Sequence, residues 1–428
     1  MKKAYQIDER RAIEKFRGHL QNDHGAIQMI LPLAEIAQKL RSGVAQFLLQ
    51  AQLQLLTLIM EDEINWVTGP AYERGGRKEV RRWGHEDGSV VINGQKVPVQ
   101  RPRARGTEGD VKIGSYELFR KEEEQQRRIW EAITRGLTTR GYGPTVRESE
   151  QSFAIGKSAV SEKFVAMSAK KVEEFLKRDL SKLRLCALLL DGVEVRQQHL
   201  VTALGIDAMG RKTILGFHQG ASENQAACDG LFSDLAGRGL NFRQLHLNLI
   251  DGSKALRAGV RKLCGDTSPI VRCQLHKRRN IVGHFAEQDQ PGWDRRLANA
   301  YDLRGYREAK AALLRIQNEL NHVNPSAARS LDEGLEETLT LQRLNVPVDL
   351  WKTLRSTNVI ESAFSIVRVV CRNVKRWRSG DQIERWVGSG LLVAEKQFRR
   401  IDGYRSLPGL LTALNADLKP PKSSVRVA

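Results

Sequence analysis

The chain has 428 residues, of which 41% are hydrophobic, so it is long enough for two or three domains with packed cores and is not a disordered protein. It carries 69 Lys and Arg against 50 Asp and Glu, and a net charge of +19 indicates a polyanionic partner, either nucleic acid or an acidic membrane surface. No apolar run is long enough to span a membrane. Residues 285–350 carry eight basic against eleven acidic residues, so the positive charge is concentrated in the rest of the chain. The basic excess is therefore uneven, which favours nucleic acid and argues against a membrane.

The start of the chain and its cysteines predict the compartment. The first residues, MKKAYQIDERR, meet acidic side chains before any apolar stretch, so we expect no signal peptide. Five cysteines without framework spacing are typical of a reduced, cytoplasmic protein.

Residues 1–65 are predicted to be a helical region, in which the acidic run Glu61 to Glu63 marks the end of the strongest helix. Residues 66–120 are predicted to be a basic β-hairpin region. The Asn93-Gly94 pair between two β-rich runs is a strong hairpin signal. The second run exposes a basic row that can lie on a phosphate backbone or can simply be a solvated face: Arg101, Arg103 and Arg105.

Residues 121–180 resemble a helix-turn-helix, with a short helix from Thr145, a turn at Gly156, and a second helix capped by Ser158. A plain pair of helices would show the same pattern. If the region reads DNA, the start of the second helix meets bases and phosphates through Lys157, Ser158, Ser161 and Lys163.

Residues 181–284 predict an α/β layer. Three consecutive strands between 186 and 220 are followed by a helix, a strand in LHLNLI, another helix, and a fifth strand in PIVRCQ. Three antiparallel strands followed by alternating helix and strand indicate a ribonuclease H-like mixed sheet. Residues 285–350 are predicted to be an all-helical insertion, and 351–428 to supply the final helix of the core and a tail.

Two carboxylates follow apolar strands in this layer. Asp191 ends the run CALLL, and Asp251 ends LHLNLI. Asp-Gly is a common turn dipeptide, which explains each position alone, but Val193 and Val195 continue the first strand beyond Asp191. In a ribonuclease H-like layer the two strands are neighbours, so the two acids would repel each other unless Mg²⁺ or Mn²⁺ lay between them.

A third carboxylate, Glu361, lies beside an apolar stripe with helical spacing in STNVIESAFSIVRVVCRNVKRW. It can belong to a capping box with Asn358, or it can complete a two-metal site that serves phosphoryl transfer. The same helical flank continues as a basic row that would hold the DNA strand: Arg368, Arg372 and Arg376.

These residues resemble the Mutator-type bacterial insertion-sequence transposases, a branch of the DDE enzymes with a ribonuclease H-like core. The resemblance covers most of the chain and rests on LLLDG, LIDGSKAL, CQLHKRRNI and STNVIES, in family order, with a long second gap that holds a helical insertion. It implies catalytic and metal-binding roles for Asp191, Asp251 and Glu361. Ala255 stands where many members have Gly.

The CQLH segment matches the family's Cys-x-x-His motif, which implies that His276 positions DNA or a water in the active site. A core cysteine beside a hydrogen-bonded histidine is the alternative, and the spacing of Cys264, Cys273, His276 and His284 does not fit a structural zinc site. The basic residues that follow predict a phosphate-contacting turn: Lys277, Arg278 and Arg279. Trp351 can stack on a base or pack in the core.

The sequence thus predicts a DNA transposase that binds terminal inverted repeats, cuts 3′ ends and joins them to target DNA, with no nucleotide cofactor. Synapsis of two ends requires at least a homodimer, and the resemblance implies a bacterial, nucleoid-associated protein that copies its element through a circular intermediate. A catalytically inactive DNA-binding repressor and a ribonuclease H-like nuclease or resolvase are the alternatives.

Overall fold

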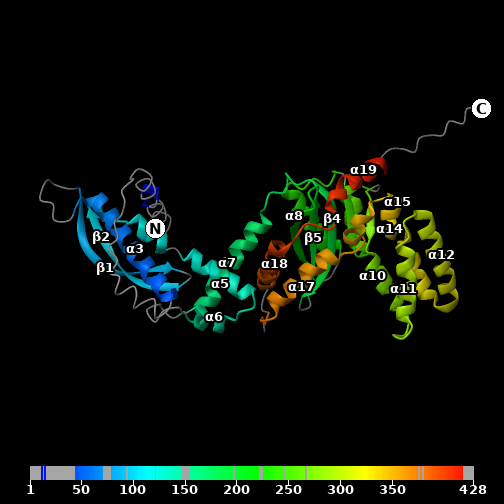
Figure 1. The fold of residues 1–428 in the computed structure, drawn as a ribbon, viewed down its shortest axis with the longest axis horizontal. Helices are drawn as coiled ribbons and strands as arrows, with labels where there is room; N and C mark the ends of the chain where they lie inside the picture. Colours follow the sequence, from blue (N-terminus) through cyan, green and yellow to red (C-terminus); the bar gives the residue numbers. More distant parts are fainter. Residues whose placement is uncertain are drawn as a thin grey trace, which may run out of the picture. The chain divides into compact units, whose positions relative to one another are not determined.

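The computed structural model describes residues 11–12, 14–15, 44–70, 79–92, 95–120, 122–146, 155–195, 198–220, 225–244, 246–265, 268–374, 376–377 and 380–417. The chain forms two compact units, Met1–Met167 and Ser168–Ala428, and the division falls inside one long helix, α7 (Lys157–Leu176). Each unit combines helices with a sheet, so the predicted α/β class is confirmed (Figure 1). No helix in the described part of the chain is long and apolar enough to cross a lipid bilayer.

The first unit is built on a three-stranded antiparallel sheet covered by a long helix, α3 (Val44–Thr68). Its strands, in spatial order, are β1 (Val80–Ile92), β2 (Gln95–Gly106) and β3 (Gly109–Val111). The pairing of β1 with β2 confirms the predicted hairpin, although Asn93 and Gly94 lie outside the described residues. The core between helix and sheet contains Leu49, Leu56, Met60, Ile64, Val90 and Val97.

The prediction that the acidic run ends the first strong helix is wrong, because α3 continues to Thr68. Two of these acids are engaged by specific partners. Glu61 pairs with Arg82 at 2.8 Å and with His85 at 2.8 Å. Glu63 is 3% exposed and accepts hydrogen bonds from the backbone N–H groups of Gly114 and Ser115, at 2.7 and 2.8 Å, and from the Ser115 hydroxyl. It therefore holds the start of helix α4 (Gly114–Arg120).

The predicted helix-turn-helix is only partly described. Helix α5 (Glu123–Thr134) is followed by α6 (Thr139–Val146), which begins before the predicted start at Thr145. Most of the predicted first helix falls on 147–154, outside the described residues. The second helix, α7, begins at Lys157, so Ser158 lies in its first turn and is not its cap. A helix-turn-helix function for this region stays a prediction.

The second unit is organised by a five-stranded mixed sheet in the order β6-β5-β4-β7-β8. Its strands are β4 (Leu185–Val195), β5 (Gln198–Asp207), β6 (Lys212–Gly220), β7 (Leu247–Ile250) and β8 (Ile270–Arg272). β4, β5 and β6 pair antiparallel, as the predicted meander requires, whereas β7 and β8 run parallel to β4. The chain turns between β5 and β6 at Gly210, whose φ of +73° suits glycine.

Two apolar cores cover the two faces of this sheet. On one face, α8 (Gln225–Gly237) and α9 (Lys254–Cys264) pack on Leu188 and Leu190 of β4. On the other face, Ala187, Leu189 and Leu249 pack against helices near the C-terminus (orange and red in Figure 1). These are α16 (Trp351–Leu354), α17 (Asn358–Cys371), α18 (Gly380–Gln397) and α19 (Leu407–Asp417).

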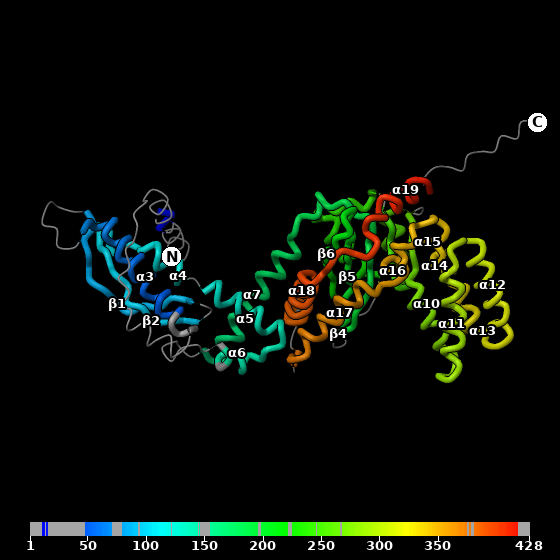
Figure 2. The backbone as a smooth tube through the Cα atoms, in the orientation of Figure 1, coloured from blue at the N-terminus to red at the C-terminus, as the bar shows by residue number. Residues whose placement is uncertain are grey.

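Residues 285–350 are helical, as predicted. Up to Leu339 they form a third core with α10 (Gln274–Val282), whereas Leu341, Leu344, Val346 and Leu350 join the core that covers the sheet. Figure 2 shows most of these helices in yellow, gathered at one end of the second unit. They are α11 (Gln290–Tyr301), α12 (Tyr306–Val323), α13 (Pro325–Asp332), α14 (Leu335–Thr338), α15 (Thr340–Arg343) and the 3₁₀ turn Val348–Leu350. A second 3₁₀ turn, Tyr404–Ser406, precedes α19.

The buried carboxylate of Glu63 yields a stability prediction. Glu63→Ala leaves two buried N–H groups without an acceptor and should lower the free energy of unfolding of the first unit by about 3 kcal/mol. Glu63→Gln should lose less, because its single carbonyl oxygen can still accept. Glu61→Ala, two residues away on the surface of the same helix, should cost under about 1 kcal/mol.

Urea unfolding combined with amide hydrogen exchange would measure both effects. Exchange at Gly114 and Ser115 should accelerate in Glu63→Ala and remain slow in Glu61→Ala. Equal exchange in the two variants would show that Glu63 does not hold α4.

Candidate active site

Strand alternation places Asp191 on the sheet face that α17 covers. Side chains on a strand alternate between faces, and Asp191 shares its face with Ala187 and Leu189, which belong to the core of α17. Leu190 of β4 pairs in parallel with Ile250, the last residue of β7, so Asp191 and Asp251 are the next residues along the two chains. The predicted proximity of these two acids is confirmed, and the charge of Asp251 raises the cost of charging Asp191.

Asp191 lies in an environment that disfavours its charge. It is 4% exposed, and its one hydrogen bond among the described residues is the 2.9 Å bond that the Gly192 N–H donates to Oδ1. Burial, and then the neighbouring charge of Asp251, raise the pKa of Asp191 to about 8. A carboxylate in this position therefore needs a cation or a proton.

Asp251 follows β7 and begins the turn into α9. Its Oδ1 accepts the Ser253 N–H at 2.8 Å, and the Ser253 hydroxyl in turn accepts the Leu256 N–H as the cap of α9. The Asp-Gly turn interpretation holds here, since Gly252 has a φ of +122°. It fails for Asp191, which lies inside β4.

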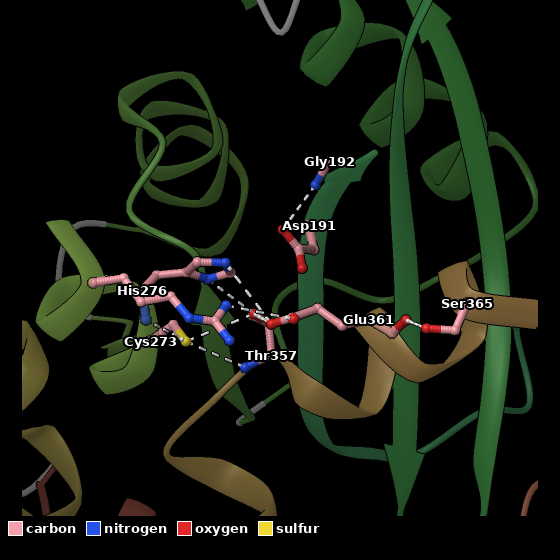
Figure 3. A network of polar contacts seen from close by, with 8 residues as sticks. Asp191, Gly192, Cys273, His276, Thr357, Glu361 and Ser365 are labelled. Carbon is pink, nitrogen blue, oxygen red and sulfur yellow. Dashed lines mark hydrogen bonds and ion pairs between the residues drawn. The ribbon is translucent and has the colours of Figure 1, made fainter. Parts of the chain in front are cut away.

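Glu361 stands one turn inside α17, above the buried stripe of Ile360, Phe364 and Val367. The capping-box interpretation is wrong, because the cap residue is Thr357 and no side chain caps this helix. Instead, the Thr357 hydroxyl donates to Oε1 of Glu361 at 3.2 Å. Figure 3 shows the Glu361 carboxylate turned toward Thr357 and His276, with Asp191 on the neighbouring strand.

A cluster of Cys273, His276 and Thr357 supports this carboxylate (Figure 3). The buried Cys273 thiol accepts the backbone N–H groups of His276 and Thr357, both at 3.4 Å. His276 Nδ1 lies 3.3 Å from the Thr357 hydroxyl, and its Nε2 lies 3.8 Å from Glu361 Oε1. The cluster therefore links α10, which begins after β8, to the start of α17.

The electrostatics of this cluster favour an ion pair. A hydrogen bond with Cys273 raises the pKa of His276 to about 9, against the opposing effect of burial. Burial disfavours the Cys273 thiolate, but its hydrogen bonds with His276 and with the Thr357 N–H keep the pKa of that thiol below its usual value. A positive His276 then faces the acids, which suits binding of a carboxylate or a phosphate.

The acids suit a hard divalent cation in chemical type, because carboxylate oxygens are the ligands that Mg²⁺ and Mn²⁺ prefer and Asp191 is buried beside a like charge. Within the described ranges, however, no three His, Cys, Asp or Glu side chains come close enough together to hold a metal ion. Glu361 is engaged by Thr357 and lies 3.9 Å from Arg279, so joint binding requires its side chain to turn.

The basic residues after CQLH lie in a helix, so the predicted phosphate-contacting turn is wrong. Lys277 is 1% exposed and donates to the Ser330 carbonyl, which leaves its ammonium unavailable to DNA. Arg278 pairs with Asp294 at 2.8 Å. Arg279 is the accessible member of the three, with 58% of its side chain exposed beside Glu361.

The basic row that follows Glu361 is shorter than predicted. Arg368 lies exposed in the last turn of α17, and Arg372 follows directly as the C-terminal cap residue. Arg376 is also exposed but lies beyond the end of the helix, so it does not continue the helical row.

In the first unit, ion pairs engage much of the predicted DNA-contacting set. Arg101 and Arg103 pair with Glu86, and Arg103 also pairs with Asp110. Arg105 instead lies 5.0 Å above the ring of Trp83, which is 52% exposed. The hairpin therefore presents a guanidinium stacked on an open aromatic ring, a surface able to contact a nucleic acid.

On α7 the predicted contacts divide in the same way. Lys163 pairs with Glu122, whereas Lys157, Ser158 and Ser161 are exposed.

Sequence reasoning missed Thr357, although its position four residues before Glu361 is the spacing at which side chains on a helix meet. Trp351 is buried and donates to the Val346 carbonyl, so it packs in the core and does not stack on a base.

Comparison with known proteins decides the family. A model of the family described as "Transposase, Mutator family" matches residues 27–400. The chain belongs to the Mutator family of transposases. The resemblance drawn from the sequence is thereby confirmed.

Relatives of this Mutator-family chain include three curated transposases. The transposase for insertion sequence element IS256 in transposon Tn4001 of Staphylococcus aureus is 25% identical over 351 residues, 78% of this chain and 86% of the relative. The transposase for ISRM5 of Rhizobium meliloti (strain 1021) is 26% identical over 314 residues, which cover 71% of this chain and 76% of the relative. The transposase for IS6120 of Mycolicibacterium smegmatis is 24% identical over 240 residues, which cover 55% of this chain and 73% of the relative.

The raised pKa of Asp191 predicts a pH-dependent cost in the metal-free protein. An acid whose folded pKa lies above its unfolded value near 4 contributes stability below pH 4, and this contribution is lost as the pH rises through about 8. Asp191→Asn, which carries no charge, should therefore exceed wild type in unfolding free energy by about 2–4 kcal/mol at pH 8.5. The difference should narrow steadily towards pH 4.

Urea unfolding in EDTA across this range would measure the difference, and added Mg²⁺ should stabilise wild type more than Asp191→Asn. A difference that is independent of pH would show that charge at Asp191 is not what destabilises the metal-free protein.

Proposed function

We propose that this protein binds the terminal inverted repeats of its insertion sequence, cleaves their 3′ ends, and joins those ends to target DNA, with Asp191, Asp251 and Glu361 as the catalytic acids. The observation that carries the proposal is the placement of these acids. Asp191 lies inside β4, Asp251 directly follows the parallel neighbour β7, and Glu361 lies on the helix that covers the same face.

The strand order supports a ribonuclease H-like core. Three antiparallel strands run β6-β5-β4, and two parallel strands extend the sheet on the other side of β4. This is the arrangement that the sequence predicted, with the first strand at the centre and its acid beside that of the fourth. In the proposed DDE-type enzyme, the insertion separates the second acid from the third.

The three acids would hold two Mg²⁺ or Mn²⁺ ions, which when bound would stabilise charge at the attacked phosphorus and activate water for cleavage or the 3′-hydroxyl for strand transfer. Asp191 contributes a buried carboxylate whose charge is otherwise costly. Glu361 contributes a carboxylate that Thr357 now holds. No nucleotide cofactor is needed, because the phosphodiester itself supplies the leaving group.

His276 and the exposed arginines position the DNA in this proposal. A protonated His276, 3.8 Å from Glu361, can hold that carboxylate or a nearby phosphate. Arg279, Arg368 and Arg372 are exposed on and beside the same helices, so they can neutralise the backbone that enters the site. In the first unit, Arg105 and the start of α7 would contact the inverted repeat.

Cleavage of DNA tests the proposal. The full-length protein and Asp251→Asn are incubated in Mg²⁺ with labelled duplexes from the two flanks of the gene. Wild type should nick one defined phosphate, and Asp251→Asn, Asp191→Asn and Glu361→Gln should each lose at least about 10³-fold in rate with DNA affinity kept within a few-fold.

Glu194→Gln is the matched control, because Glu194 is an exposed carboxylate on the same strand as Asp191. It should cleave like wild type. Binding without cleavage by wild type on both flanks, in Mn²⁺ as well as Mg²⁺, would contradict the enzyme and favour a repressor.

A further inference from the structure

A pocket of about 450 Å³ opens beside the end of β7, and none of the three acids lines it. Its wall begins with Ile250 and Gly252, on either side of Asp251 in the chain, and continues along the first turns of α9. The loop between α13 and α14 closes it from the insertion. Its charged lining consists of Lys254, Arg257, Arg272, Glu333 and Glu337.

The charges in this lining do not cancel. Arg257 pairs with Glu337 at 2.5 Å, and Arg272 Nη2 lies 3.4 Å from Glu333 Oε2. Lys254 is exposed at the start of α9 and has no acidic partner in the part of the chain that the structure describes. Since a helix N-terminus adds partial positive charge, the pocket attracts anions beside Lys254.

Arg272 is held rigidly at the base of this pocket. It is 7% exposed, its Nη1 donates to the Glu333 carbonyl at 2.9 Å, and its buried Nε has no hydrogen-bond partner among the described residues. A Cβ atom at Gly252 would lie 2.6 Å from Nε, and one at Gly334 would lie 2.4 Å from Nη1. Both glycines also have positive φ, so the backbone at both positions is shaped to admit the guanidinium.

We propose that this pocket binds a backbone phosphate of the DNA, one that lies outside the reacting position, through Lys254 and Arg272. Glu333, whose side chain is 51% exposed, occupies the place of the phosphate beside Arg272 and moves into solvent when DNA binds. A planar guanidinium and a nearby ammonium are suited to a phosphodiester oxyanion. The inference rests on the proposed function in taking DNA as the source of the phosphate.

Fluorescence anisotropy of labelled duplex and single-stranded DNA with the full-length protein in EDTA tests the pocket without cleavage. Lys254→Gln should weaken binding about 3–10-fold at 0.1 M salt and reduce the slope of log K against log salt by about one. Glu333→Gln should strengthen binding, because it removes the competing carboxylate. Lys262→Gln, on the same helix but paired with Asp229 at 3.5 Å, should match wild type within twofold.

Equal affinities for Lys254→Gln and Lys262→Gln, or no gain from Glu333→Gln, would overturn the proposal. Arg272→Lys tests the guanidinium in the same assay and should also weaken binding. Its melting temperature is measured alongside, and the Lys254 and Glu333 variants, whose side chains are exposed, decide the outcome if Arg272→Lys does not fold.

Inorganic phosphate and a mononucleotide at millimolar concentration distinguish the source of the anion. Stabilisation by free phosphate that depends on Lys254, with unchanged DNA affinity in Lys254→Gln, would assign the pocket to a small anion and overturn its role with DNA. Because binding is measured without divalent metal, a failure of this pocket is separate from a failure of cleavage, which the Asp251→Asn comparison reports.

Discussion

The second unit depends on one constraint: a carboxylate buried inside a central strand lies beside a second carboxylate, which directly follows the parallel neighbouring strand. Asp191 is almost fully buried, and Asp251 stands beside it in the strand register. Burying Asp191 beside a like charge costs several kcal/mol unless a cation or a proton compensates. The strands around them are correspondingly apolar, since Ala187, Leu189 and Leu249 must supply the packing that the acids cannot. The apolar stripe of α17 packs on this face, which places Glu361 on the same side of the sheet as Asp191.

Hydrogen bonds between the start of α10 and the segment before α17 fix the position of Glu361. The Gln274 N–H donates to the Arg355 carbonyl at 2.9 Å, and the Cys273 thiol binds the N–H of Thr357. These bonds join the end of β8 to a segment some eighty residues later in the chain. Thr357 is fully buried and contacts the acid, the histidine and the thiol, so one hydroxyl couples the positions of all three. The CQLH and STNVIES motifs thus form one hydrogen-bonded cluster.

Much of this arrangement could be predicted from the sequence, because strand alternation and helical spacing are local. The five strands and the buried stripe of α17 follow from apolar periodicity alone. Which cations remain accessible could not be predicted, because ion pairs form between distant elements. Arg101, Arg103 and Lys163 look alike in sequence to Arg105 and Lys157, yet Glu86, Asp110 and Glu122 engage only the first three. The prediction that Lys277 contacts DNA failed for a similar reason, because no local pattern indicates that a lysine in a basic run is buried against Ser330. The extent of α3 past its acidic run likewise depends on partners at Arg82, His85 and Ser115.

The helical insertion has a consequence for the order in which a newly made chain can fold. All five strands are synthesised before residue 285, whereas α17 emerges only after the insertion with its separate core. Until then, the face formed by Ala187, Leu189 and Leu249 has no cover from the C-terminal helices, and the two aspartates lack their third partner. A product truncated within the insertion would expose this apolar face and would be prone to aggregate. Glu361 and the rest of α17 follow the insertion in the chain, so a product truncated within the insertion lacks the helix that covers this face.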